Sequence, residues 1–233
     1  MPAYRPALAS PPPARPTRRT MRRLAAAAAA LAVMPAWAAS SCEARSGATA
    51  PVVVELYTSE GCSSCPPADR WLSSLKGRPG VVPLAFHVDY WDRLGWPDRF
   101  ASAAITQRQY QWADAHRSRT VYTPQVVADG ADWRQWPDLP AAGRASPLAL
   151  TLTRDGQAVR AEVEPPPDAR PGQRLQGYWA VVEDGHASRV TAGENRGETL
   201  RHDHVVRLYR PVGDWPASQP QRWTLPVLPG VPE

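Results

Sequence analysis

The feature that most constrains this sequence is a pair of cysteines, Cys62 and Cys65, separated by two residues in the stretch TSEGCSSCPP. The β-branched and apolar run 52–57 precedes the pair and predicts a buried strand. Apolar residues at helical spacing follow over 68–75 and predict a helix. A cysteine pair in a short loop between a strand and a helix lies where the unpaired N–H groups of the first helical turn favour a thiolate.

The residues alone leave three uses for this pair open, and the first is metal binding. A zinc site usually needs four ligands, yet the sequence holds no second C-x-x-C. His202 and His204 could add ligands, although an alternating strand would direct both toward one face as ordinary surface residues. Zinc or copper handling therefore stays an alternative, and no metal ligand is assigned.

A structural staple and a working redox pair are the other two uses. A disulfide across two residues closes a very small loop and removes little conformational entropy from the unfolded chain. The strand–loop–helix context favours a redox pair, with Cys62 as the exposed nucleophile and Cys65 as the partner that resolves a mixed disulfide. No cofactor is expected, because the disulfide itself carries the electrons.

The N-terminal segment indicates export. Met21-Arg22-Arg23 is followed by the alanine-rich apolar run 24–34 and by a small-x-small cleavage site, Ala36-Trp37-Ala38. This is the three-part layout of a secretory signal, and the apolar run is too short to span a bilayer. We expect residues 1–38 to be a signal peptide, with Met21 as the true start, and the mature protein to reside in the periplasm or outside the cell.

The proposed cleavage changes the meaning of the net charge. The whole chain has a formal net charge of +5, but residues 1–38 carry six arginines and no acidic residue. The remainder has 21 basic and 22 acidic residues, so a nucleic-acid partner is not expected. No later segment reaches about 18 apolar residues, and no membrane span is expected. Residues 39–50 should form a mobile tail with Cys42 as a lone thiol. Because Ala39 does not suit a lipoprotein signal, no lipid anchor at Cys42 is expected.

The rest of the chain predicts two regions of different pattern, and the fold class is α/β. The first region, 51–146, is expected to contain helix 68–75, strand 81–88, a helix from Pro97 to about His116, strand 125–128 and, after Asp129-Gly130, a return strand 131–136. The second region, 147–233, is expected to be a β-rich, sandwich-like domain. Its predicted elements are a hairpin of 148–153 with 158–163 and further strands at 178–182, 189–191, 200–209 and 222–225.

The order strand, C-x-x-C, helix, strand, helix, Thr-Pro and strand resembles the thioredoxin-like fold. The sequence is also similar to DUF1223, a thioredoxin-like family of secreted bacterial proteins. The matching stretches are VVELYTSEGCSSCPPAD (53–69), FHVDYWDRLGWPDRF (86–100), VYTPQVVADG (121–130) and GENRGETLRHDHVVR (193–207). The resemblance implies that Pro124 follows a cis peptide bond and lies beside the cysteine pair, where it would shape a substrate groove.

Three features depart from that pattern. Pro66 disfavours the helical region at Cys65, so the helix is expected to start after the pair. The segment after Gly130 is short and rich in proline, which indicates that the last helix of the fold is missing or reduced. Glu60, two residues before Cys62, would oppose formation of a thiolate there.

Further candidates for the substrate groove are Thr123, Asp89, Trp91 and Trp96. The two tryptophans flank an aromatic loop at the carboxyl end of the second strand, the end that faces ligands in open α/β sheets, with core packing as the alternative. Asp89 would place a polar group near the cysteines or cap the loop. The GENRG stretch, 193–197, is expected to pack back against the first region.

The sequence therefore predicts a secreted thiol–disulfide oxidoreductase. Its partners would be thiols and disulfides of extracytoplasmic proteins, together with an unidentified redox partner that recycles the pair. The main alternative of a different class is a non-catalytic binding module in which the disulfide is structural.

Overall fold

The computed structural model describes residues 42–146, 148–156 and 158–226. Within these ranges, no helix has both the length and the apolar character needed to cross a membrane. The predicted signal peptide, residues 1–38, lies outside the described residues.

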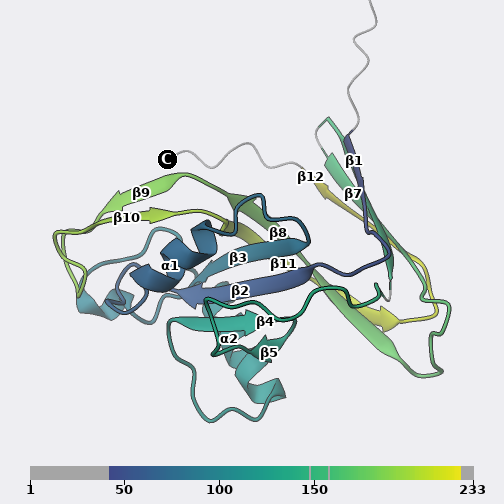
Figure 1. The fold of residues 1–233 in the computed structure, drawn as a ribbon, viewed down its shortest axis with the longest axis horizontal. Helices are drawn as coiled ribbons and strands as arrows, with labels where there is room; N and C mark the ends of the chain where they lie inside the picture. Colours follow the sequence, from purple (N-terminus) through teal and green to yellow (C-terminus); the bar gives the residue numbers. More distant parts are fainter. Residues whose placement is uncertain (1–41, 147, 157, 227–233) are drawn as a thin grey trace, which may run out of the picture. The chain divides into compact units, whose positions relative to one another are not determined.

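A six-stranded mixed sheet, in the order β5-β4-β2-β3-β11-β8, carries most of the core (Figure 1). Strands β2 and β3 are parallel, whereas the pairs β2–β4, β4–β5 and β8–β11 are antiparallel. Strand β11 joins β3 in parallel at the register Val205↔Ala85. The strands are β2 (Val52–Thr58), β3 (Val81–His87), β4 (Gln125–Ala128), β5 (Ala131–Asp132), β8 (Arg174–Glu183) and β11 (Val205–Pro216).

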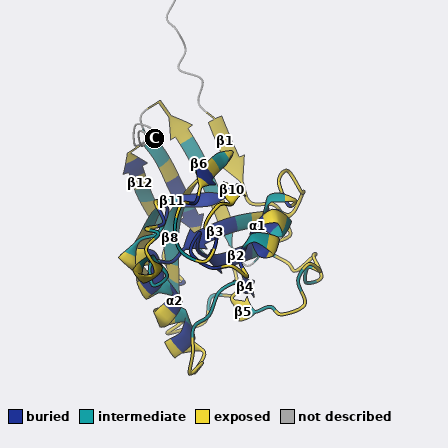
Figure 2. Cartoon of the chain, turned by 90° about the vertical axis from the view of Figure 1, so that its left-hand side faces the viewer, coloured by how far each residue is buried: buried dark blue, intermediate teal, exposed yellow. Residues whose placement is uncertain are grey.

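Helices α1 (Pro66–Ser73) and α2 (Ala103–Ala115) cover opposite faces of this sheet. Leu56 of β2 belongs to the same core cluster as Leu72 of α1, whereas Tyr57 belongs to a second cluster with Ile105 of α2. Alternate residues of a strand point to opposite faces, so a strand covered on both sides is apolar nearly throughout. Figure 2 shows most of β2 and the second half of β3 as buried, and together with the two helices they form an α/β arrangement.

A second, four-stranded antiparallel sheet has the order β1-β6-β7-β12. Its strands are β1 (Cys42–Arg45), β6 (Ala149–Asp155), β7 (Ala158–Glu164) and β12 (Gln221–Pro226). The β6–β7 hairpin confirms the alternation that the sequence predicted. Two short strands, β9 (His186–Arg189) and β10 (Thr199–His202), form a separate antiparallel pair close to α1.

The predicted starts of the two helices, residue 68 for α1 and Pro97 for α2, are wrong, although α1 does start after the cysteine pair. Helix α1 begins at Pro66, and its N-cap Cys65 has helical dihedral angles, φ −78° and ψ −36°. Proline suits the first turn of a helix because no N–H is needed there, and this preference outweighs the restriction on the preceding residue. Helix α2 begins at Ala103 with Ser102 as its N-cap, whereas Pro97 precedes it in a loop that contains the 3₁₀ turn η1 (Asp92–Leu94).

The predicted organisation of the C-terminal half also differs. The boundary near residues 137–147 does not separate two sheets, because β8 and β11 continue the sheet of β2, β3 and β4. The predicted strand 200–209 is broken between β10 and β11, where His204 has a φ of 58°. The expected tail 39–50 contains β1, in which Cys42 is paired in register with Arg154 and keeps a free, exposed thiol. The return strand after Gly130 is limited to β5.

A buried ion pair joins four elements on the α2 side of the sheet. Glu55 of β2 accepts hydrogen bonds from Arg108 of α2 and from the hydroxyl of Tyr178 in β8, the latter at 2.9 Å. The Arg108 guanidinium lies 4.3 Å from the ring centroid of Tyr178 and 5.1 Å from that of Tyr209 in β11. Since both charges are largely removed from water, each depends on the other.

We expect Arg108→Met to lower the free energy of unfolding by about 3 kcal/mol, because it leaves the Glu55 carboxylate buried without its cation. Adding Glu55→Gln to that variant should restore part of the loss. Urea unfolding measures both changes. Arg222→Met is the matched control, since the Arg222–Glu162 pair is exposed on β12 and β7, and it should cost less than about 1 kcal/mol. Equal losses in the two single variants would contradict a role for burial.

Candidate functional site

The two predicted cysteines form a disulfide in the loop that links β2 to α1. We call residues 59–65 the cysteine loop. Cys62 and Cys65 are joined with their Cα atoms 5.5 Å apart. The Cys62 N–H donates to the Ser59 carbonyl at 3.1 Å, and the Cys65 carbonyl accepts from the N–H groups of Ala68 and Asp69. The pair therefore lies at the N-terminus of α1, as the sequence predicted.

Both cysteines are fully buried, each with 0 % relative exposure. The expectation that Cys62 is exposed is therefore wrong for this disulfide form, and its role as the nucleophile stays a prediction. The two residues between the cysteines, Ser63 and Ser64, are exposed instead. Two segments that lie far away in the sequence contact the cysteine loop.

One covering segment is the GENRG stretch between β9 and β10, which we call the covering loop, residues 193–197. Asn195 donates through Nδ2 to the carbonyl oxygens of Glu60 at 2.8 Å and Cys62 at 3.0 Å. Glu194 accepts through Oε2 from the N–H of Ser63 at 3.0 Å and from its hydroxyl at 2.8 Å. The expectation that this stretch packs against the first region is confirmed.

The aromatic loop before α2 supplies a second cover. The Cβ of Trp91 lies 3.0 Å from the point that a side-chain Cβ at Gly61 would occupy, so a larger residue at Gly61 would displace the tryptophan. The indole N–H of Trp91 donates to the hydroxyl of Thr123 at 2.8 Å, and the Thr123–Pro124 peptide bond is cis. Trp91 therefore connects the cysteine loop to the segment that contains Pro124.

The other predicted groove residues have different places. Trp96 lies beneath the cysteine loop, where its indole N–H donates to Glu60 at 2.8 Å. Asp89 accepts a hydrogen bond from Thr106 of α2 at 2.6 Å and so anchors that helix. Pro124 lines a cavity of about 230 Å³ together with Tyr122, Val126, Trp133, Arg134 and Trp136.

Glu60 is the first of five buried ionisable residues beneath the cysteine loop. Its side chain has no exposed surface, and Oε1 lies 3.2 Å from Nε2 of His202 in β10. The two atoms are not aligned as a regular hydrogen bond, and the contact is a close approach of an imidazole nitrogen to a carboxylate oxygen. Burial acts to raise the pKa of Glu60, but contact with His202 and the bond from Trp96 outweigh it and hold the pKa below its usual value.

An ion pair between His87 and Asp98 lies beside the Glu60–His202 contact. Nδ1 of His87, at the end of β3, is 2.7 Å from Oδ2 of Asp98, and both side chains have no exposed surface. Asp98 also accepts from the N–H groups of Glu60 and Phe100, each at 2.9 Å. Although burial opposes both charges, the attraction raises the pKa of His87 and lowers that of Asp98.

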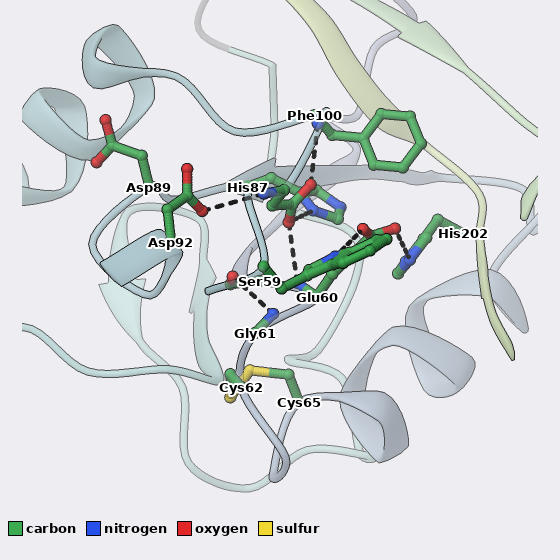
Figure 3. A network of polar contacts seen from close by, with 12 residues as sticks. Ser59, Glu60, Gly61, Cys62, Cys65, His87, Asp89, Asp92, Phe100 and His202 are labelled. Carbon is green, nitrogen blue, oxygen red and sulfur yellow. Dashed lines mark hydrogen bonds and ion pairs between the residues drawn. A yellow bond between two sulfur atoms is a disulfide. The ribbon is translucent and has the colours of Figure 1, made fainter. Parts of the chain in front are cut away.

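The Glu60–His202 and His87–Asp98 pairs belong to one cluster, which Figure 3 shows together with the disulfide. The rings of His87 and His202 are 5.0 Å apart, and Phe100 packs against both. Asp69 of α1 completes the set: burial raises its pKa, and the two histidines act against that rise. Such a concentration of buried charge is typical of functional sites, although structural ion pairs also produce it.

The metal alternative finds no ligand set in the part of the chain that the structure describes, where no three His, Cys, Asp or Glu residues are grouped as metal ligands. His202 and His204 do not share a strand face, because the chain turns between them. His202 meets Glu60, while Nδ1 of His204 lies 3.4 Å from Asp184.

The sequence did not predict the histidine–carboxylate pairs or the hydrogen bonds of Asn195. Nothing in the local pattern identifies Asp98, eleven residues after His87, as the partner of that histidine. One signal was present: all these residues fall within the motif stretches 53–69, 86–100 and 193–207.

The His87–Asp98 pair predicts a pH dependence that a double-mutant cycle with His87→Gln and Asp98→Asn would measure. The lowered pKa of Asp98 gives stability that is present above its ordinary value of 3.8 and lost as the pH falls through the folded value. The raised pKa of His87 gives stability that is present below 6.5 and lost as the pH rises through the folded value. We expect a coupling energy of about 2 kcal/mol between these limits, with a decline on either side. A coupling that stays constant from about pH 4 to pH 9 would exclude an ion pair.

Comparisons with known proteins agree with the motif stretches. A family model described as a protein of unknown function, DUF1223, matches residues 53–233. The X-ray crystal structure of an Agrobacterium tumefaciens protein, a structural genomics target, superposes with a TM-score of 0.60 at 26 % identity, covering 78 % of this chain and 81 % of that one. A search of curated proteins found no match. The chain belongs to the DUF1223 family.

Proposed function

We propose that this protein is a thiol–disulfide oxidoreductase with a thioredoxin-like core. The core is the segment β2–α1–β3–α2–β4, in which the cysteine pair follows β2 and Thr123-Pro124 precedes β4. This order agrees with the one on which the sequence resemblance rests. Residues 133–146, after β5, contain no helix, in agreement with the expected reduction of the last helix.

The proposed reaction moves two electrons between the pair and a partner. In the reduced protein, the Cys62 thiolate attacks one sulfur of a substrate disulfide, and a mixed disulfide forms as the substrate's other sulfur leaves as a thiolate. Cys65 then attacks Cys62, which releases the second substrate sulfur and restores the Cys62–Cys65 disulfide. The substrate gains two electrons, and the reverse sequence oxidises a substrate dithiol.

Helix α1 contributes to activation of the cysteine thiols. Because the pair lies at the start of α1, the unpaired N–H groups and the positive end of the helix dipole favour a thiolate over a thiol. Glu60 was expected to oppose this effect. Its carboxylate is turned into the buried cluster, where it accepts a hydrogen bond from Trp96 and contacts His202.

The observation that carries the proposal is the contact between the cysteine loop and the buried ionisable cluster. Glu60 is a member of both, and Asp69 follows Cys65 by one helical turn. A staple needs no such cluster, since replacement of buried ion pairs by apolar residues is often neutral or stabilising. Groups whose pKa values are shifted beside a cysteine pair suit a reaction that forms and consumes thiolates.

One observation favours the second candidate, a non-catalytic binding module with a structural disulfide. A partner thiol cannot reach either sulfur in this structure, because both cysteines are fully buried. Structural disulfides in secreted proteins resist reduction, whereas exposed disulfides are more easily reduced.

The proposed location is the periplasm or the exterior of the cell, and the proposed partners are extracytoplasmic protein thiols and disulfides. Both rest on the predicted signal peptide. A stable disulfide is consistent with an oxidising compartment.

Trapping of mixed disulfides tests the proposal. Cys65→Ser should accumulate a covalent adduct between Cys62 and a peptide disulfide, because the resolving thiol is absent. Cys62→Ser should form at least about tenfold less adduct, since Cys65 is then the only thiol of the pair. Non-reducing mass spectrometry identifies the linked cysteine.

The third cysteine is the matched control for trapping. Cys42→Ser, made in the Cys65→Ser background, should leave the adduct unchanged, because Cys42 lies exposed on β1 and outside the site. Adduct formed at Cys42 alone, or none on any variant, would favour the binding module.

A further inference from the structure

The closed site presents a mechanical problem for any exchange reaction. A thiolate must contact a disulfide sulfur to form the mixed disulfide, yet both cysteines have 0 % exposure. Some covering segment must therefore move before a partner can react.

The covering loop, residues 193–197, is held to the cysteine loop by hydrogen bonds. Its hold on the cysteine loop consists of four hydrogen bonds, two from Asn195 and two to Glu194. Asn195 is the one buried residue of the five, so opening withdraws no large apolar side chain from the core. By contrast, displacement of α1 would expose Leu72 and Leu75.

The ends of the covering loop suit such a movement. Gly193 has a φ of 73° and Gly197 a φ of 94°, values that residues with a side chain rarely adopt. Glu194 and Arg196 are exposed to solvent. A short loop with glycine at both ends can change its backbone angles without moving β9 or β10.

We propose that the covering loop is a lid over the disulfide, with Glu194 and Asn195 as its latch, and that its opening uncovers Cys62 before Cys65. The latch binds the carbonyl of Cys62, the carbonyl of Glu60 and the N–H and hydroxyl of Ser63. None of these four bonds goes to Cys65, whose carbonyl is held within the first turn of α1. The biological role of this lid rests on the proposed function, whereas the test of the lid does not require that function.

The chemistry follows from which sulfur is uncovered. A partner thiolate bonds to Cys62, the bond between Cys62 and Cys65 breaks, and Cys65 leaves as a thiolate at the start of α1. A second partner thiolate then attacks the partner sulfur that is bound to Cys62. The partner disulfide forms, Cys62 leaves as a thiolate, and the cysteine pair is reduced. Glu194 and Asn195 touch neither the partner nor the reacting sulfurs in this scheme, and they act as positioning residues.

The experiment measures how fast a water-soluble phosphine reduces the disulfide of the intact oxidised protein, with thiol alkylation and mass spectrometry as the readout. We expect Asn195→Ala and Glu194→Ala each to be reduced at least about tenfold faster than the wild type, because each loses two latch bonds. Ser63→Ala, which removes one donor from the opposite side, should be faster by a smaller factor. Glu194→Gln keeps an acceptor oxygen and should fall between Glu194→Ala and the wild type.

Arg196→Ala is the matched control, because Arg196 lies in the same loop and has no side-chain hydrogen bond among the described residues. It should be reduced within about twofold of the wild-type rate. Thermal midpoints separate latch release from general loosening, since the acceleration should be present in variants whose midpoint is unchanged. If Asn195→Ala does not fold, Glu194→Ala and Ser63→Ala still decide the question.

Two results would overturn the lid. One is a wild-type rate in every latch variant, and the other is an equal acceleration in Arg196→Ala. The phosphine needs no protein partner, so the two proposals fail separately. Faster reduction of the latch variants without any trapped adduct on Cys65→Ser would keep the lid and reject the oxidoreductase. Trapping without faster reduction would do the reverse.

Discussion

The buried carboxylate of Glu60 is the interaction on which the arrangement around the disulfide depends. Glu60 stands at the start of the cysteine loop, and its groups contact Trp96, Asp98, Asn195 and His202. These partners come from the aromatic loop, the covering loop and β10. The carboxylate contacts Trp96 and His202, whereas Asp98 and Asn195 bind the backbone N–H and carbonyl of the same residue. A buried charge is costly unless it is paired and hydrogen-bonded, so the aromatic loop and β10 must be in place before the carboxylate can be accommodated. Glu60 thereby joins the cysteine loop to three other segments.

This dependence explains why the C-terminal half is built into the core and not appended to it. Strand β11 extends the sheet next to β3, and the β9–β10 pair brings His202 and the covering loop to the end of α1. On the other face, Arg108 and Glu55 join α2 and β2 to β8. The C-terminal strands thus supply partners to buried charges on both faces of the sheet. A core that ended at residue 146 would leave Glu55 and Glu60 without several of those partners.

The sequence predicted what local pattern controls. The apolar run 52–57, the cysteine pair and the Asp155-Gly156 hairpin each have a signal within about ten residues, and the corresponding elements were confirmed. The predicted start of α2 was wrong because the helix signal of Pro97 lies five residues before the N-cap, Ser102. The burial of Cys62 could not be predicted, since its cover comes from Glu194 and Asn195, more than 130 positions away. Contacts across such a distance produce no periodic pattern in the sequence. The motif stretch 193–207 indicated that this region matters, but it did not indicate which residues it contacts.

The reduction potential of Cys62–Cys65 decides between the working redox pair that we propose and a structural disulfide. The purified protein would be equilibrated in glutathione buffers of known potential, and the reduced fraction would be determined by alkylation. We expect a value within the range of exchange proteins, about −120 to −270 mV. A value well below about −300 mV would identify a structural bond and exclude a working redox pair.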